Sequence, residues 1–402
     1  MFEKEDCLRE VMRQKIFTLS CAVLAIMVPE AGLTQDFAEP LAEEPIPAVE
    51  TLPAQYPKSW MLIHDFHFES IVDGRIVVVD LDSPSQPVKG FVQAAQFGNS
   101  LISESKNEIY TAETYYSRLS RGDRTDVVTI WDTATLTPKG EILLPGGKRQ
   151  LSVTYKNTFQ FTNKERWALV FNFTPAQSVT VVDLDARKFL GEIDLPSCAQ
   201  VYPTGDKGFT TFCADGAMVS VVLNDAGGVE SSVTVKNAID SDNQPLFGTP
   251  ALIDQTAWFV SYHGLIKGFD LSGVTAKILP GEFLIKKADG AVTEWRPSGW
   301  QVISSDVHGK LYILMNPEGK EGSHKDGGTE VWVIDPVKKA RVGRIPLQGQ
   351  GFSIEVTREE KPRLVVARPD AVIDVYDAVS GDLIHSLGAT VGFSPIVLTA
   401  VD

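Results

Sequence analysis

Histidine and cysteine are the side chains best suited to bind metals or act as nucleophiles, and the 402-residue sequence contains six histidines and four cysteines. The closest approach to a metal-binding pair is His64 with His67, in the segment HDFHF. Side chains three residues apart on a β-strand point to opposite faces, so one metal ion would not easily bind both. We therefore expect ordinary strand or loop histidines and no metal site.

Two cysteines, Cys198 and Cys213, are fifteen residues apart and lack the C-x-x-C spacing that is typical of metal ligands. In an oxidising compartment such a pair forms a disulfide, which in the chain-entropy model contributes roughly 3 kcal/mol to stability. The alternative is a pair of buried free thiols. The other two, Cys7 and Cys21, fall in an N-terminal segment that we expect to be removed.

A complete catalytic motif is missing from the sequence. There is no G-x-G-x-x-G opening a helix, no P-loop, no G-x-S-x-G and no H-E-x-x-H, so nucleotide, acyl-transfer and zinc-hydrolase chemistry lack their usual signals. The formal net charge is -15, and no basic stripe compensates it. Because phosphate binding depends on lysine and arginine, this balance argues against a nucleic-acid partner.

Three segments have a composition that is unusual for plain strands. Residues 114–126 (TYYSRLSRGDRTD) are aromatic and cationic, and their arginines could pair with nearby acids or contact a partner. Residues 295–301 (WRPSGWQ) form an aromatic loop suited to core, rim or interface, and residues 316–328 (NPEGKEGSHKDGG) are polar and Gly-rich. The candidate partner contacts in these segments are Arg118, Arg121, Trp295, Trp300, His324 and Lys325.

The N-terminus is predicted to be a secretory signal peptide spanning residues 1–31. Arg13 and Lys15 precede an apolar run of thirteen residues (16–28), and Ala31 offers a small residue for cleavage. The run is shorter than the roughly 20 residues that a membrane span needs, so we expect no retained span. Lipidation of Cys21 is a weaker alternative because the apolar run continues past it.

Residues 32–57 are expected to form an acidic, Pro-rich arm, since they show neither alternation nor helical periodicity. After the arm, one pattern recurs: a β-branched strand, an acidic or amide residue, a short turn and a second strand. The intervals between the terminal residues are 52, 51, 41, 46, 65 and 42, close to the period of about 40–50 residues of propeller blades. The copies are RIVVVD ending at Asp80, DVVTIWD at Asp132, SVTVVD at Asp183, MVSVVLN at Asn224, LIKGFD at Asp270, EVWVID at Asp335 and VIDVYD at Asp377.

These seven copies predict an all-β fold: a seven-bladed β-propeller of four-stranded antiparallel blades over residues 58–402. The repeated Asp should accept hydrogen bonds from the backbone amides of the turn that follows it, and the preceding Val and Ile residues should pack between neighbouring blades. One acid per blade at a fixed place in a hairpin is typical of architecture. We therefore do not consider these Asp residues catalytic.

Several segments together resemble the heavy subunits of the tryptophan tryptophylquinone amine dehydrogenases, which oxidise methylamine or aromatic amines. The resemblance runs from near residue 60 to the C-terminus and is more specific than any single blade repeat. The similar segments are TYYSRLSRGDRTDVVTIWD, CAQVYPTGDKGFTTFC, SYHGLIKGFDLSG, WRPSGWQ and PEGKEGSHKDGGTEVWVID.

This resemblance implies a periplasmic heterotetramer of two heavy and two light chains that converts primary amines to aldehyde and ammonia. The quinone would form from two tryptophans of the light chain, so this chain would carry neither cofactor nor catalytic residue. Electrons would pass to a blue copper protein similar to azurin or amicyanin. The heavy chain would supply a scaffold and part of the substrate channel, with Phe97 at the channel mouth and Cys198–Cys213 as the family disulfide. For Phe97, the alternative is inter-blade core.

Two other hypotheses stay open at this point. One is a periplasmic propeller that acts as a binding or scaffold protein without redox activity. The other is a propeller enzyme that holds its own quinone or metal, which would need a convergent set of ligands near the axis. Both aromatic and aliphatic amines are compatible with the dehydrogenase hypothesis, since both chains would shape the channel.

Overall fold

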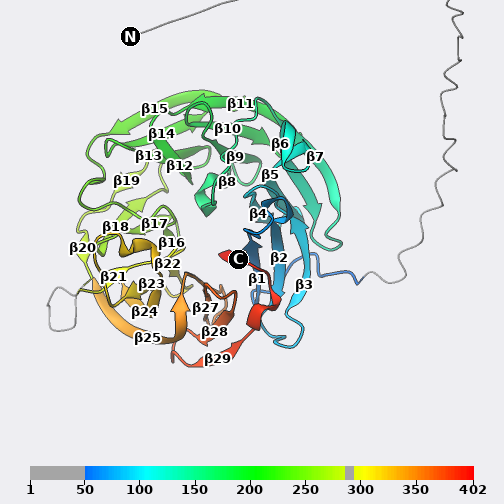
Figure 1. Ribbon diagram of the computed structural model, residues 1–402. Helices are drawn as coiled ribbons and strands as arrows, with labels where there is room; N and C mark the ends of the chain where they lie inside the picture. The colour runs from blue at the N-terminus through cyan, green and yellow to red at the C-terminus, as the bar shows by residue number, and fades with distance from the viewer. Residues whose placement is uncertain (1–49, 286–293) are drawn as a thin grey trace, which may run out of the picture. The chain divides into compact units, whose positions relative to one another are not determined.

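The computed structural model describes residues 50–285 and 294–402, in which seven antiparallel sheets form a ring (Figure 1). The predicted signal peptide and residues 32–49 of the predicted arm lie outside the described residues. The prediction of a seven-bladed β-propeller is confirmed. In the described part of the chain, no helix has the length and apolarity needed to cross a membrane.

Each of the first four blades contains four strands, which are named in order from the axis outward. They are β30 (Pro395–Ala400), β1 (Trp60–Asp65), β2 (Arg75–Asp80) and β3 (Val88–Gln93); β4 (Asn99–Ser103), β5 (Glu108–Arg118), β6 (Arg121–Asp132) and β7 (Pro138–Leu144); β8 (Phe159–Thr162), β9 (Trp167–Asn172), β10 (Ser178–Asp183) and β11 (Lys188–Asp194); and β12 (Cys198–Pro203), β13 (Gly208–Cys213), β14 (Met218–Leu223) and β15 (Val229–Val235).

The outermost strand of the fifth blade and the innermost strand of the sixth are each split into two short pieces. The strands of these blades and of the seventh are β16 (Ala251–Ile253), β17 (Thr256–Val260), β18 (Leu265–Asp270), β19 (Lys277–Ile278) and β20 (Phe283–Leu284); β21 (Arg296–Pro297), β22 (Ile303–Ser305), β23 (Leu311–Asn316), β24 (Gly328–Asp335) and β25 (Ala340–Gly351); and β26 (Ser353–Val356), β27 (Arg363–Ala367), β28 (Ile373–Asp377) and β29 (Leu383–Ser386). Four 3-10 turns connect strands: η1 (Ile71–Asp73), η2 (Lys156–Thr158), η3 (Ser323–Lys325) and η4 (Gly388–Thr390).

The two ends of the ring are joined by strand pairing in the first blade. The C-terminal strand β30 is the innermost strand of that blade and pairs antiparallel with β1, with Met61 opposite Ala400 and Ile63 opposite Leu398. This pairing joins the C-terminal strand to the N-terminal strands in one sheet, while each blade keeps its own short inner edge strand.

The repeated Asp residues cap turns, as the sequence predicted. The Oδ1 atom of Asp132, at the end of β6, accepts hydrogen bonds from the amides of Ala134 (3.0 Å) and Thr135 (2.9 Å). Asp377, at the end of β28, does the same for Val379 and Ser380. These backbone bonds favour the charged carboxylate and hold the pKa of both Asp132 and Asp377 below its usual value.

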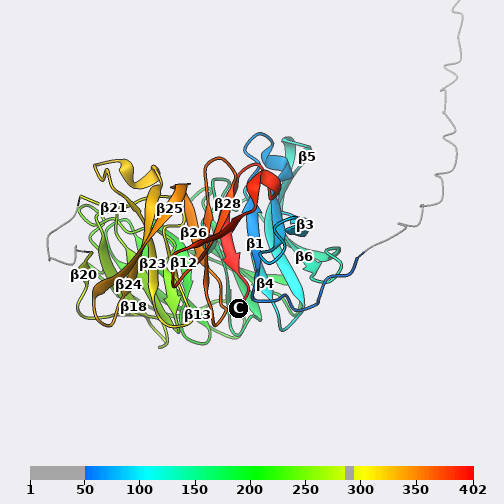
Figure 2. The same cartoon turned by 90° about the horizontal axis from the view of Figure 1, so that it is seen from below.

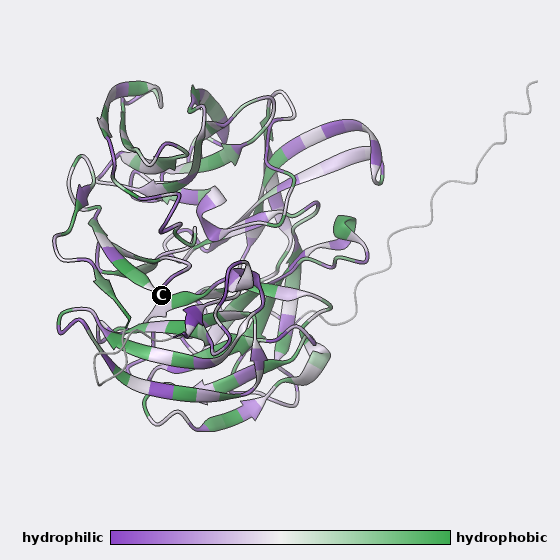
Figure 3. Cartoon of the chain, turned by 60° about the vertical axis from the view of Figure 1, so that its left-hand side comes forward, coloured by the Kyte–Doolittle hydropathy of each residue, from purple (hydrophilic) through white to green (hydrophobic). Residues whose placement is uncertain are grey.

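The hydrophobic core lies between blades and not at one centre. Hydrophobic residues recur on the strands throughout the ring (Figure 3), and several strands, such as β9 and β23, are buried along their whole length, so both faces of a blade meet its neighbours. Val128 and Ile130 of β6, for example, pack in one buried cluster with Phe159 and Val170 of the next blade. The predicted packing of Val and Ile between blades is confirmed.

Strand direction assigns every connection to one of two faces (Figure 2). Connections from one blade to the next, and from the second to the third strand of a blade, lie on one face, which we call the link face. Connections from the first to the second strand, and the Asp turns between the third and fourth, lie on the opposite face, which we call the turn face. Residues far apart in sequence therefore meet on the link face.

Candidate functional site

All the residues that the sequence suggested as channel or partner contacts lie in connections on the link face. Phe97 lies between β3 and β4, and the tip of the β5–β6 hairpin carries the two arginines. The other two segments lie before β22 and between β23 and β24. The fold thus brings to one face four segments that lie between Phe97 and Lys325 in the sequence, although it does not gather them into one cluster.

Phe97 is half-buried in an aromatic cluster at the edge of the first blade. Its ring meets the buried ring of Phe66 edge-on, with centroids 5.9 Å apart, and lies 6.0 Å from the ring of Phe68. Phe68 is 46% exposed, and nearby Phe393 is 64% exposed and stacks on His67. The cluster therefore runs from the core to an exposed apolar surface.

Arg149 holds the backbone that carries Phe97. Both Gln96 and Phe97 have a left-handed φ (55° and 54°), which costs energy for residues with a Cβ. The buried guanidinium of Arg149 donates to the carbonyl oxygens of Gln96 (2.7 Å) and Phe97 (3.1 Å), and Thr154 Oγ1 donates to the same Phe97 oxygen (2.7 Å). These bonds hold the backbone at Gln96 and Phe97, from which the Phe97 ring extends.

His64 is buried next to Phe66, whose ring also contacts Phe97. Neither ring nitrogen has a hydrogen-bond partner among the described residues, and the ring contacts Phe66 edge-on at 4.2 Å. Burial, together with the positive charge of Arg149, lowers the pKa of His64 to about 3, so the imidazole is neutral. Strand β1 ends between the two histidines, so His64 lies on the strand and His67 in the loop that follows it.

The link between β7 and β8 reaches across the axis of the ring. Trp300, from the sixth blade, stacks on Tyr155 with centroids 4.4 Å apart, and its indole N–H donates to the carbonyl oxygen of Thr154 (3.1 Å). Both the ring and the indole N–H of Trp300 therefore make contacts within this chain. Next along the same link, Lys156 forms an ion pair with Glu355 of β26.

Glu355 is a buried carboxylate that joins three blades at the axis. Its oxygens accept hydrogen bonds from Gln301 (2.8 Å) and Ser304 (2.6 Å) in addition to the Lys156 contact. Burial alone would raise the pKa of Glu355, but Lys156 and Arg358 hold it below its usual value. The charge is therefore structural, because the network ties the inner strands together.

Two of the predicted contacts, Arg118 and Arg121, lie at the tip of the β5–β6 hairpin. Arg118 and Arg121 are exposed, and in the described part of the chain neither forms an ion pair or hydrogen bond through its side chain. Between them Leu119 is 73% exposed. By contrast, Arg124 pairs with Asp126 at 2.8 Å, which is the pairing with nearby acids that the sequence left open for this group.

The remaining predicted contacts lie at the sixth blade. Trp295 is half-buried against the core, 5.5 Å from Trp332, which makes it mainly a packing residue. His324 stacks on Tyr262 with centroids 4.1 Å apart, and burial lowers its pKa. Lys325 is exposed, and no ion pair involves it among the described residues.

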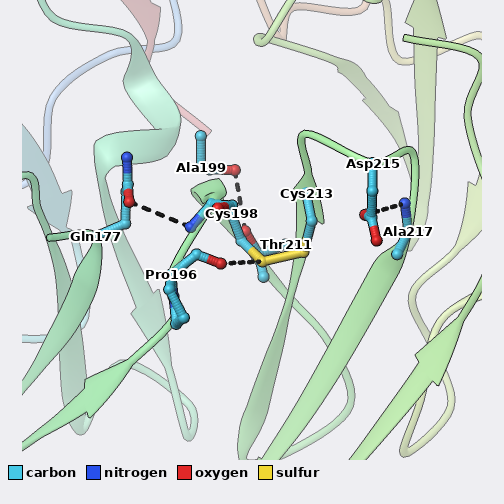
Figure 4. Close-up of a disulfide and its surroundings, with 9 residues drawn as sticks. Gln177, Pro196, Cys198, Ala199, Thr211, Cys213, Asp215 and Ala217 are labelled. Carbon is cyan, nitrogen blue, oxygen red and sulfur yellow. Dashed lines mark hydrogen bonds between the residues drawn. A yellow bond between two sulfur atoms is a disulfide. The ribbon is translucent and has the colours of Figure 1, made fainter.

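Cys198 and Cys213 form the predicted disulfide (Figure 4). They are register partners at the ends of β12 and β13, beside a pocket of about 530 Å³ on the link face. Thr211 of β13 donates to the carbonyl oxygen of Ala199 (3.0 Å) just below the bond. The alternative of two free thiols is wrong.

The exposed aromatic rings and arginines of the link face are suited to contact another molecule. In residues 50–285 and 294–402, no group of three His, Cys, Asp or Glu side chains could hold a metal ion. Sequence reasoning missed Arg149, Thr154 and Phe68, whose roles depend on contacts between separate blades. No local signal marks Arg149, which follows a lysine in an ordinary Gly-rich loop.

Comparison with solved structures shows the same fold at low sequence identity. A putative 6-phosphogluconolactonase from Bacteroides fragilis has a TM-score of 0.55 at 12% identity, covering 89% of this chain and 100% of that one. A dihydro-heme d1 dehydrogenase has a TM-score of 0.51 at 13% identity, covering 87% and 78%. At such identities the likeness extends to the fold alone.

Comparison of sequences is more specific. The methylamine dehydrogenase heavy chain of Methylorubrum extorquens is 27% identical over 323 residues, covering 80% of this chain and 78% of that protein. The corresponding protein of Methylophilus methylotrophus is 28% identical over 345 residues, covering 84% and 82%. The family model for the methylamine dehydrogenase heavy chain matches residues 61–402, which is most of the chain. This chain therefore belongs to the methylamine dehydrogenase heavy chain family.

Proposed function

We propose that this protein is the heavy subunit of a periplasmic quinoprotein amine dehydrogenase, which converts primary amines to aldehyde and ammonia. It would assemble with a light chain into a heterotetramer of two heavy and two light chains, and the enzyme would pass electrons to a blue copper protein. The observation that carries the proposal is the family match over residues 61–402, together with a link face that presents Phe97.

The link face suits the docking of a second chain. It carries exposed Phe68, Phe393 and Leu119, and exposed arginines at the hairpin tip. Aromatic residues and arginine are enriched at the centres of protein interfaces. The proposed light chain would cover this face, and Phe97 would form part of the wall of the substrate channel between the two chains.

The cofactor implied by the family, tryptophan tryptophylquinone, would be built from two tryptophans of the light chain and would supply the two-electron acceptor for oxidation of the amine to the aldehyde. This chain's part is to shape the space beside it. Phe97 fits that task because its ring is held by the Phe66 contact and by the Arg149 and Thr154 bonds to its carbonyl oxygen. A fixed aromatic wall excludes water and orients the carbon chain of an amine.

The test is to purify the native protein from its source, run a denaturing gel and record the visible spectrum with and without an added amine. We expect a co-purifying chain of much smaller size, whose quinone band bleaches when methylamine or tyramine is added. A lone, colourless chain would contradict the proposal and would favour the alternative of a propeller scaffold without redox activity.

A further inference from the structure

A pocket on the turn face, far from the Phe97 cluster, has features of a small-molecule site. Its volume is about 520 Å³, within the range of roughly 300–1,000 Å³ that is usual for ligand sites. It is formed by the inner strands and adjoining turns of the third, fourth and fifth blades, and we call it the axial pocket. Its lining residues include Asn157, Gln160, Phe161, Asp206, Leu252 and Asp254.

Two carboxamides that line the axial pocket have their nitrogens engaged within the chain. The amide nitrogen of Gln160 is engaged with the carbonyl oxygen of Lys156 (2.8 Å), and that of Asn157 contacts the carbonyl oxygen of Val201 (3.4 Å). These bonds orient the two carboxamides, and neither side-chain oxygen accepts a hydrogen bond from the described residues. Asn157 is only 7% exposed, yet it lines the pocket.

The charged residues that line the pocket favour a positively charged ligand. Three acids line it, Glu165, Asp206 and Asp254, against one base, Lys164, which leaves a balance of -2. Glu165 is occupied by hydrogen bonds from two serines of the second blade, whereas Asp206 and Asp254 accept no hydrogen bond and form no ion pair within the described ranges. Two carboxylates are therefore available to a ligand.

The rest of the wall is apolar, with contributions from Phe161, Leu252, Leu271 and two prolines. Leu252 is 52% exposed, so its side chain offers apolar surface to a ligand. An acceptor-rich, acidic and partly apolar pocket matches a ligand that donates hydrogen bonds, carries positive charge and has a hydrocarbon body.

We propose that the axial pocket binds a small organic ammonium ion with an apolar body, such as an arylalkylammonium ion. The ammonium group donates to a free oxygen of Asn157 or Gln160 and its charge is attracted to Asp206 and Asp254, while the hydrocarbon body covers Leu252 and Phe161. This site is on the face opposite Phe97, so the inference goes beyond the proposed function and does not depend on it.

The test is calorimetric titration of the purified native assembly with N,N-dimethyl-2-phenylethylamine. This tertiary amine is a cation at neutral pH and cannot condense with a carbonyl, so its binding is separate from any amine oxidation. We expect saturable binding, and binding at least about tenfold weaker for the neutral 2-phenylethanol, because it lacks the charge. Equal affinity for the two compounds, or no saturable binding of the cation, would overturn the proposal.

Variants locate the site. Asp206→Asn with Asp254→Asn should weaken binding of the cation about tenfold, and Lys164→Gln should tighten it, because exposed charge pairs contribute modestly but with a definite sign. Asn is chosen because Asp254 has a left-handed φ of 53°, which Asn tolerates. The matched control, Asp194→Asn with Asp382→Asn, removes the same charge at exposed positions elsewhere on the surface. Equal weakening by the control would show a general charge effect and no site.

Discussion

The Nη1 atom of Arg149 donates a hydrogen bond of 3.1 Å to the carbonyl oxygen of Phe97, across 52 residues of sequence. This contact connects the link that leads into the third blade to the loop that presents an aromatic ring on the link face. Because the same guanidinium also bonds Gln96 at 2.7 Å, one buried cation stabilises two consecutive residues in a left-handed conformation. The position of Phe97 thus depends on Arg149.

Replacing Arg149 by Met should destabilise the fold by about 2–4 kcal/mol, because it leaves buried carbonyl oxygens without their donors. The loss should appear as a lower urea midpoint in equilibrium unfolding. Arg118→Met, at the exposed hairpin tip, is the control and should unfold like the wild type. Equal midpoints for the two variants would contradict the proposed role of Arg149.

The buried imidazole of His64 should make stability depend on pH. Its pKa is about 3 in the folded protein, whereas an unfolded histidine has a pKa of about 6.5. Between these values the unfolded chain binds a proton that the folded protein does not, so the free energy of unfolding falls as the pH falls. The loss due to His64 should reach about 2 kcal/mol at pH 5.

His64→Leu should remove this part of the pH dependence, and it should not destabilise the protein at pH 8, since the two ring nitrogens are unpartnered among the described residues. The measurement is urea unfolding of both proteins at pH 5 and pH 8. His263→Leu, a substitution of a partly exposed histidine, is the control. The hypothesis fails if His64→Leu keeps the wild-type difference between the two pH values.

The Cys198–Cys213 bond should contribute roughly 3 kcal/mol, as expected for a closed loop of about 15 residues. The double variant Cys198→Ser with Cys213→Ser should lower the free energy of unfolding by that amount. Reduction of the wild type should give the same unfolding curve, while the reductant should leave the variant unchanged. A variant as stable as the oxidised protein would contradict this prediction.

The hairpin arginines should contribute to light-chain docking. Arg118→Glu with Arg121→Glu should weaken the assembly with the light chain at least about tenfold, mainly through a slower association rate, and the effect should diminish at high salt. Lys188→Glu with Lys361→Glu, on the turn face, makes the same charge change and serves as control. Surface-captured light chain provides the measurement, and equal association rates for both double variants would argue against this docking site.

The sequence was sufficient for the fold because the fold repeats. Seven copies of one pattern, each ending at Asp or Asn, independently predict a strand followed by a capped turn. The six intervals between them give the blade spacing. The Asp132 turn and the inter-blade packing of Val128 and Ile130 follow from these local rules. The disulfide was predictable because two cysteines allow only one pairing outside the N-terminal segment.

The site was harder to predict because it is formed by contacts between blades. The bonds from Arg149 to Phe97 and from Trp300 to Thr154 join segments 52 and 146 residues apart, and neither has a local pattern. Sequence composition identified the hairpin arginines as unusual, but only the structure distinguishes the paired Arg124 from Arg118 and Arg121, whose side chains have no partner in the described part of the chain.

The sharpest test of the proposed channel is the substrate preference of the assembled enzyme after substitution of Phe97. If the Phe97 ring forms part of the channel wall, its removal takes away contact area that an aryl group uses and that methylamine is too small to reach. Phe97→Ala should therefore lower kcat/KM for 2-phenylethylamine about tenfold more than for methylamine, because losing a buried aromatic contact costs about 1–2 kcal/mol.

Phe91→Ala is the matched control, since Phe91 is an exposed phenylalanine on β3, away from the Phe66 cluster, where it lies under the guanidinium of Arg75. It should leave both kcat/KM values unchanged. Phe97→Leu should restore part of the lost selectivity, because it refills the space with an apolar side chain. A purely structural loss does not distinguish substrates by size. An equal fall in kcat/KM for both amines in Phe97→Ala would therefore show that Phe97 belongs to the inter-blade core and not to the channel wall.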